Sequence, residues 1–206
     1  MSKKEAPISA LQTYLPPNTY GPVLHYLQFY KVHLTVAKER KSILGDYRHR
    51  HGAQTHRISV NGNLNPYAFL ITLLHELAHL LTFEKWGNKV SAHGKEWKTV
   101  FGQLLAQFIE HDVFPADIKT VLLQSLHNPA ASSCADEALL RTLRMYDENK
   151  GNSHFVESLP DGAVFKTHDG RIFQKGEKMR KRYRCVELAT KRMYLFSPVY
   201  EVEVVG

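Results

Sequence analysis

Cysteine is scarce in this sequence. The chain of 206 residues contains 2 cysteines, Cys134 and Cys185, which lie far apart and form no C-x-x-C pair. This scarcity argues against a disulfide-stapled scaffold and suits a reducing environment. We therefore expect a cytoplasmic protein.

Long hydrophobic runs are also missing. The longest nearly apolar stretch, residues 68–83, is interrupted by polar residues and is too short to cross a bilayer comfortably. The chain begins with MSKKEAPISALQTYLPP, which has no apolar segment, so we expect no secretion signal and no membrane partner. At 43% hydrophobic and 11% aromatic residues, the chain can nevertheless bury the core of one domain, with or without a small appendage.

Acidic residues are outnumbered, and the formal net charge is +7. Residues 166–192 hold ten lysines and arginines against three acidic residues, an excess equal to that of the whole chain. Residues 38–57 form a second basic segment, with six lysines and arginines, two acids and three histidines. Clustered positive charge indicates a polyanionic partner such as DNA, which would make the protein nucleoid-associated. The alternative is a solvated basic face.

The order of predicted elements indicates an α+β fold. A helix over residues 19–31 precedes strands in the stretches 32–37, 42–50 and 56–62. Gly45, inside the second stretch, suggests a bulge or a close approach of the backbone to another group. A long helix then begins with Asn65 as N-cap and Pro66 at its first position, and Gly87 supplies its stop.

The rest of the chain divides into two further helices, a connecting helix and a C-terminal tail. Ser91 is the expected cap of a helix whose apolar residues recur at helical spacing, and a short helix follows at residues 115–126. We expect a domain over residues 1–131, a connecting helix over 132–150 and a small antiparallel β unit over 151–206. The apolar residues of the capped helix are Trp97, Phe101, Leu104, Leu105 and Phe108.

Three polar residues interrupt the apolar run LLHELAHLL, which is residues 73–81. His75 and His79 are four residues apart, so on a helix they share one face and can bind one cation such as zinc. Glu76 is placed to meet a metal-bound water as a general base. The alternative is a pair of core histidines satisfied by other groups, but apolar flanks on both sides favour the metal.

A catalytic zinc requires a third protein ligand. The next histidine, His93, lies 14 residues beyond His79, and an intervening turn can bring it back towards the first pair. Its spacing and its position on the buried face of the second helix favour it. The rival ligands are carboxylates, namely Glu84, Glu96 and Glu110.

The segment FLITLLHELAHLLTFEKWGNKVSAHGKEWKTVF, together with the upstream ILGDYRHR and HRISVNGNLN, resembles the SprT family. These are zinc metallopeptidase-like domains related to the Spartan proteases, and the resemblance covers roughly residues 20–110. It implies a zincin-like metallopeptidase fold, one zinc bound by His75, His79 and His93, and Glu76 as catalytic base. It also implies cleavage of DNA-bound or DNA-crosslinked proteins in a DNA-dependent manner.

The tail departs from many relatives, which end in a four-cysteine zinc ribbon. Its only cysteine is Cys185, so a metal-free β unit is expected. Arg180, Arg182 and Arg184 alternate, so a strand would place them on one face. Together with Lys181, these arginines are expected to contact phosphates. Tyr194 and Phe196 are candidates for stacking on bases. The alternative is pairing of these arginines with Glu201 and Glu203 across strands.

The predicted function is that of a zinc metalloendopeptidase acting on a protein or peptide substrate. Its substrate would add to an edge strand among residues 32–62. Tyr47, His49 and Tyr67 are candidates for the oxyanion-stabilising group. Two alternatives are a metallopeptidase without DNA dependence and a zinc-stabilised binding module without turnover.

Overall fold

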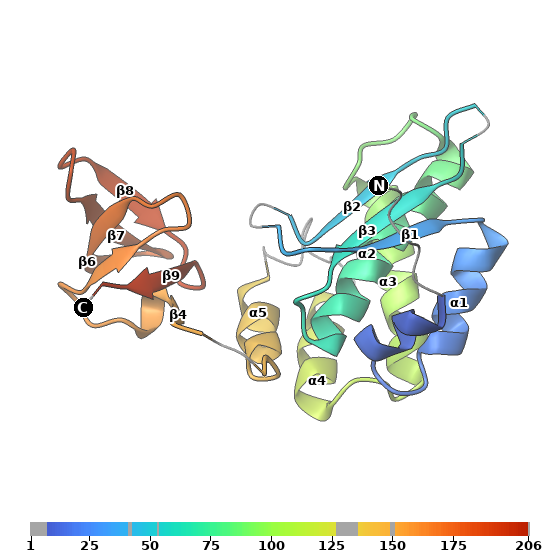
Figure 1. Cartoon of the computed structure of the whole chain (residues 1–206), viewed down its shortest axis with the longest axis horizontal. Helices are drawn as coiled ribbons and strands as arrows, with labels where there is room; N and C mark the ends of the chain where they lie inside the picture. The colour runs from blue at the N-terminus through green and yellow to red at the C-terminus, as the bar shows by residue number, and fades with distance from the viewer. Residues whose placement is uncertain (1–7, 41–42, 53, 127–135, 149–150, 206) are drawn as a thin grey trace, which may run out of the picture. The chain divides into compact units, whose positions relative to one another are not determined.

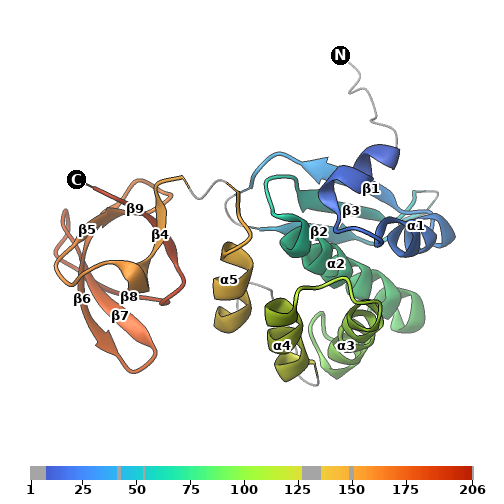
Figure 2. The ribbon, with the colours of Figure 1, turned by 90° about the horizontal axis from the view of Figure 1, so that it is seen from below.

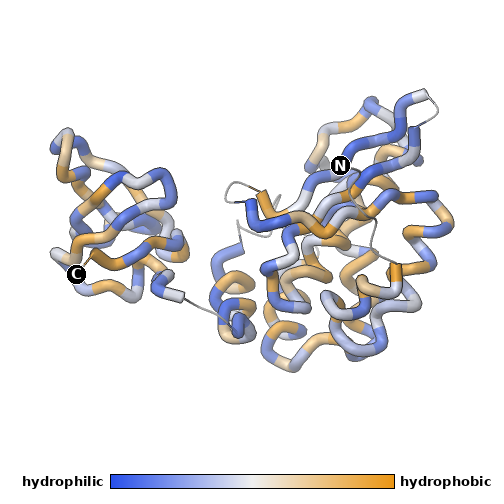
Figure 3. The backbone as a smooth tube through the Cα atoms, in the orientation of Figure 1, coloured by the Kyte–Doolittle hydropathy of each residue, from blue (hydrophilic) through white to orange (hydrophobic). Residues whose placement is uncertain are grey.

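The computed structural model describes residues 8–40, 43–52, 54–126, 136–148 and 151–205. The chain forms two compact units, Met1–Tyr146 and Asp147–Gly206, each with its own hydrophobic core. Hydrophobic and hydrophilic residues alternate along the chain in both units (Figure 3), as expected of elements that bury one face.

The first unit contains a three-stranded mixed sheet. The central strand β3 (Arg57–Asn61) is parallel to β1 (His33–Ala37) and antiparallel to β2 (Gly45–Arg48). These strands match the predicted stretches, although β2 is shorter than residues 42–50. Because β3 occupies the middle, β1 and β2 are the edges of the sheet.

Helices α2 and α3 lie on one face of this sheet (Figure 2), and α2 contacts both β2 and β3 on one side and α3 on the other. The helix α5 falls in the range predicted for the connecting helix and buries Leu139 and Leu143 in the core of the first unit. Residues 132–135 and 149–150 of that range lie outside the described residues. The helices are η1 (Ile8–Tyr14), α1 (Tyr20–Phe29), α2 (Pro66–Trp86), α3 (Lys95–Glu110), α4 (Ala116–Ser125) and α5 (Glu137–Arg144).

The central helix α2 begins and ends as its sequence predicts. The side chain of Asn65 accepts a hydrogen bond from the amide of Ala68, and Pro66 occupies the first turn. Gly87 adopts a φ of 60° at the other end, where other residues are disfavoured. By length and composition α2 would be able to cross a membrane, but most of it is buried, as in a core helix.

The start of α3 differs from the prediction. Its N-cap is Gly94, not Ser91, because the carbonyl of Ser91 accepts a hydrogen bond from the Gly94 amide in a preceding turn. The helix therefore begins about one turn later than expected. Its predicted apolar face is confirmed, since all five of those side chains are buried.

The second unit is a curled antiparallel sheet (Figure 2) with strand order β4-β9-β5-β6-β7-β8. Its core includes Phe165, Phe173, Cys185 and Val202. The strands are β4 (Ser153–Phe155), β5 (Val164–Lys166), β6 (Ile172–Met179), β7 (Arg182–Glu187), β8 (Met193–Phe196) and β9 (Glu201–Val204), with η3 (Val156–Ser158) after β4.

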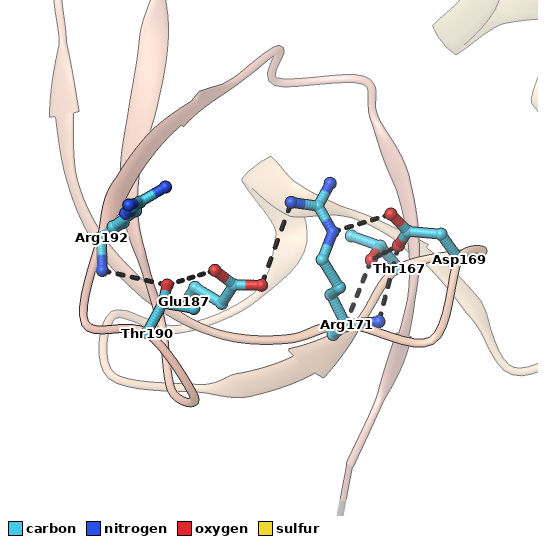
Figure 4. Close-up of polar contacts among 6 residues, drawn as sticks. All are labelled: Thr167, Asp169, Arg171, Glu187, Thr190 and Arg192. Carbon is cyan, nitrogen blue, oxygen red and sulfur yellow. Dashed lines mark hydrogen bonds and ion pairs between the residues drawn. The ribbon is translucent and has the colours of Figure 1, made fainter.

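Several charged side chains of the second unit bind one another (Figure 4). Arg171 contacts Asp169 through Nε at 2.7 Å and the buried Glu187 through Nη1 at 3.9 Å. Thr190 donates a further hydrogen bond to Glu187. Part of the positive charge in residues 166–192 therefore serves the fold of this unit.

Candidate metal centre

Three histidine side chains converge in the first unit. His75 and His79 lie one turn apart on α2, and His93 lies in the turn before α3. The Nε2 atom of His75 is 3.2 Å from Nε2 of His79 and 3.3 Å from Nε2 of His93. Such spacing allows one cation to contact all three nitrogens at the ~2.0–2.1 Å typical of zinc–nitrogen bonds. The helix face and the turn thus bring together the predicted ligand residues, although His93 precedes α3 and does not lie on the face of that helix as expected.

Electrostatics keep these imidazoles neutral. Burial, and then the neighbouring imidazoles, lower the pKa of His75 to about 3 and that of His79 to about 4. Burial also lowers the pKa of His93, aided by Lys98. Neutral imidazole is the form that binds a metal. Within the described part of the chain, the buried Nδ1 of His75 has no hydrogen-bond partner.

The indole of Trp97 contacts all three imidazoles. Its ring centroid lies 4.7 Å from that of His75, 5.2 Å from that of His79 and 4.7 Å from that of His93. Trp97 itself is fully buried in the first turns of α3. The sequence placed Trp97 on a buried face, and its contacts with the histidines come from the packing of α3 on α2.

The carboxyl group of Glu76 is buried against the backbone of Gly45, and the residue is only 6% exposed. A Cβ at position 45 would lie 2.5 Å from Glu76 Oε1, so the predicted close approach at this glycine is confirmed. Burial, and then the charge of Asp46, raise the pKa of Glu76 to about 8, while Arg40 opposes the rise. A carboxyl group with such a pKa can accept and release protons near neutrality.

Arg40 belongs to the predicted basic segment 38–57 but is used inside the unit. Its guanidinium donates to Asn61 Oδ1 at 2.8 Å and to Ser59 Oγ at 2.9 Å. The side-chain Nδ2 of Asn61 donates in return to the backbone carbonyls of Arg40 and Ile43, each at 3.0 Å. These bonds fix the segment before β2, and hence Gly45, against β3.

The rival third ligands do not join the histidine cluster. Among the described residues, the group able to hold a metal consists of His75, His79 and His93. The carboxylate of Glu84 instead lies 3.2 Å from Arg50 and from His56.

The three candidates for the oxyanion-stabilising group lie in different surroundings. The ring of Tyr47 is parallel to that of His79, with centroids 6.4 Å apart. His49 stacks on Phe83 at 4.5 Å. Tyr67 packs against Tyr146 at 5.0 Å, in the helical part of the unit. Of the three, Tyr47 is the one found beside a histidine of the cluster.

The predicted arginine face of the tail is wrong in part. Arg180, with a φ of 50°, and Lys181 lie in the turn between β6 and β7, so only Arg182 and Arg184 share a strand face. The side chain of Arg184 lies 3.6 Å from Glu177. The four basic residues therefore mark the β6–β7 hairpin.

Two further predictions about the tail are corrected. Glu201 and Glu203 lie on β9, between β4 and β5, so the sheet order separates them from the arginines of β7. Phe196 is 9% exposed and belongs to the core, so it is unavailable for stacking on bases. Tyr194 is partly buried, and its ring lies 5.4 Å from that of Phe173.

Comparison with known proteins identifies relatives of the first unit. Residues 22–119 match the model of the SprT-like family. Protein SprT of Yersinia pseudotuberculosis serotype O:1b (strain IP 31758) is 34% identical over 89 residues, which cover 39% of this chain and 52% of that protein. Protein SprT of Yersinia pestis is 33% identical with the same coverage. The chain thus spans about half the length of the curated relatives it matches, and no solved structure matches it.

Proposed function

From the match of residues 22–119 to the SprT-like family, we propose that the chain is a zinc-dependent endopeptidase. The observation that carries the proposal is the convergence of three neutral imidazoles, together with the buried carboxyl group of Glu76, the residue that follows His75 on α2. Three nitrogen ligands leave a fourth position open in a tetrahedral zinc site, as catalysis requires.

His75, His79 and His93 would hold the metal through their Nε2 atoms, with one zinc per chain. When bound, zinc would act as a Lewis acid that polarises the scissile carbonyl and lowers the pKa of a water molecule. The fully buried Trp97 packs against all three imidazoles and excludes solvent from that side of the cluster.

Glu76 is the proposed general base. Its carboxylate takes a proton from the attacking water, whose oxygen bonds to the carbonyl carbon of the peptide. The same proton then passes to the leaving nitrogen as the C–N bond breaks. Burial favours the protonated carboxyl group, so Glu76 retains the proton between the two transfers.

Strand β2 is the proposed docking edge for the substrate. It is an edge of the sheet, and its first residue, Gly45, contacts Glu76, while Tyr47 lies beside His79. A peptide added along β2 would form main-chain hydrogen bonds, which tolerate many sequences.

Metal content and turnover of Glu76→Gln test the proposal. We expect the variant to retain zinc and to lose hydrolysis by roughly 10²–10⁴-fold, the usual contribution of a general base. Glu187→Gln, which alters a buried carboxyl group of the second unit, is the matched control and should retain both. Unchanged turnover in Glu76→Gln would refute this mechanism, and zinc binding without turnover in the wild type would favour a binding module.

DNA-bound or DNA-crosslinked proteins are the second part of the proposal, as substrates. The observation that favours it is the exposed β6–β7 hairpin, where Arg180, Lys181 and Arg182 are all exposed. Cleavage of a DNA-bound protein and of the same protein free in solution should be measured with and without DNA. Equal rates in all arms would support a metallopeptidase without DNA dependence.

A further inference from the structure

Four polar side chains form a connected row beside His79. The hydroxyl of Tyr47 lies 2.9 Å from His56 Nδ1, and His56 Nε2 lies 3.2 Å from Glu84 Oε1. The guanidinium of Arg50 in turn contacts Glu84 Oε1 at 3.2 Å. His56 is only 2% exposed, whereas Arg50 is exposed, so the row runs from the interior of the first unit to its surface.

The backbone determines which nitrogen of His56 carries the proton. The amide of Arg50 approaches His56 Nδ1 at 3.4 Å, and because an amide can only donate, Nδ1 must be the acceptor. The ring proton is then on Nε2, facing the carboxylate of Glu84. That contact is poorly aligned for a hydrogen bond and is chiefly an electrostatic attraction.

With Nδ1 as the acceptor, the hydroxyl of Tyr47 donates its one proton to His56. It has no second proton to give to a developing oxyanion. What Tyr47 presents to the metal centre is its ring, which lies parallel to His79 within 2°. The ring position is determined by the bond to His56 and, through His56, by Glu84.

We propose that Glu84, His56 and Tyr47 are positioning residues that hold the imidazole of His79 in the orientation needed for metal binding. This inference rests on the proposed zinc centre and adds residues outside its ligand set. It also explains why Glu84, a rival ligand by sequence, is absent from the cluster: its carboxylate is directed at His56 and Arg50. Groups that orient metal ligands typically contribute ~10–100-fold to metal affinity.

Zinc titration of the metal-free chain against a chromophoric chelator tests the inference. We expect Tyr47→Leu and Glu84→Gln to weaken zinc affinity by ~10-fold or more, because each releases the ring of Tyr47 from its position. Tyr47→Phe retains the ring and should show a smaller loss. The control is Tyr146→Phe, which removes a comparable phenol hydrogen bond, 2.7 Å to Asp117, elsewhere in the unit and should leave zinc affinity unchanged.

The melting temperature of each metal-free variant separates positioning from a merely structural role. Lower melting temperatures with unchanged zinc affinity in Tyr47→Leu, Tyr47→Phe and Glu84→Gln would overturn the inference. A loss of affinity in Glu84→Gln as large as that in His75→Ala would also overturn it, because Glu84 would then be a ligand.

The outcomes for the proposed function are distinct. Zinc binding by the wild type with equal affinity in the variants contradicts only the positioning role. Weaker zinc binding in the variants, with no hydrolysis of any peptide by the wild type, supports the positioning role and contradicts the proposed endopeptidase.

Discussion

Two sets of buried ionisable side chains, one in each unit, have opposite kinds of partner. In the second unit, Lys175 and Glu187 are each 5% exposed, and each has a partner of opposite charge, Asp161 at 3.6 Å and Arg171 at 3.9 Å. In the first unit, His75 is 8% exposed and faces two other imidazoles. Buried titratable groups that face one another without a counter-charge are characteristic of candidate functional sites, and these three histidines could hold a metal ion.

The physical consequence is a difference in stability. A buried charge that is paired with a counter-charge can have no net effect on stability or can raise it. A buried polar group without a partner lowers the stability of the fold until a ligand provides the partner. Lys175 also donates to the carbonyl of Leu159, so its ammonium is satisfied within the second unit. Changes at compensated and uncompensated sites should therefore have different effects, and four experiments test this difference.

The largest expected effect is on zinc affinity. His75→Ala removes a nitrogen that lies within 3.3 Å of both other Nε2 atoms and should weaken zinc binding by more than ~100-fold, beyond the range seen for groups that only orient ligands. Lys175→Met in the second unit should leave zinc affinity unchanged, because its partners all belong to that unit. Elemental analysis and chelator competition measure the zinc content and the zinc affinity of both variants. Equal zinc affinity in His75→Ala and wild type would show that the histidine cluster is not a zinc site and would contradict this comparison of the two units.

The next effect is on the pH dependence of stability. Glu76 has a pKa of about 8 when folded and 4.5 ordinarily, so between these values the folded chain holds a proton that the unfolded chain has released. The free energy of unfolding of the metal-free wild type should therefore fall as pH rises through this window, by at most ~1.4 kcal/mol per pH unit. Glu76→Gln cannot titrate and should lose this dependence.

Urea unfolding in the presence of a chelator, between pH ~6.5 and ~8.5, measures this slope. This pH range matters because titration of the histidines changes the free energy of unfolding in the opposite direction. The pKa values of His75 and His79 are lowered from 6.5, so their contribution is lost only as pH falls below that value. Identical slopes for wild type and Glu76→Gln would show that other groups compensate for the burial of this carboxyl group.

Two glycines provide a matched pair with intermediate effects. A Cβ at Gly45 would lie 2.5 Å from Glu76 Oε1, and one at Gly176 would lie 2.7 Å from the carbonyl oxygen of Arg184. Alanine at either position should cost ~1–3 kcal/mol through overpacking. Only Gly45→Ala should also reduce peptide hydrolysis, because it displaces Glu76. Equal turnover in the two folded variants would contradict the assignment of Gly45 to the site.

The smallest effect concerns the hairpin of the second unit. Arg180 and Lys191 both have positive φ, at 50° and 59°, where asparagine is tolerated better. Each substitution by asparagine should therefore raise the free energy of unfolding by up to ~1 kcal/mol. Arg180→Asn alone should also reduce the salt slope of DNA affinity, by ~0.9 for one lost phosphate contact. An unchanged slope in Arg180→Asn would exclude Arg180 as a phosphate contact.

Local signals in the sequence predicted much of the first unit. The caps Asn65 and Gly87 fix the ends of α2 because their interactions involve residues only a few positions away. The four-residue spacing of His75 and His79 places them on one helix face wherever the helix packs. The apolar repeat of α3 likewise predicted which of its side chains are buried.

Long-range contacts decided the rest. The sequence left His93, Glu84, Glu96 and Glu110 as rivals for the third ligand, and only the packing of α3 on α2 brought His93 to 3.3 Å from His75. Arg40 counted as part of a basic segment until the path of the chain placed it against Asn61. In the second unit, strand order separated the arginines of β7 from Glu201 and Glu203, because pairing across a sheet depends on topology that alternation along one strand does not specify.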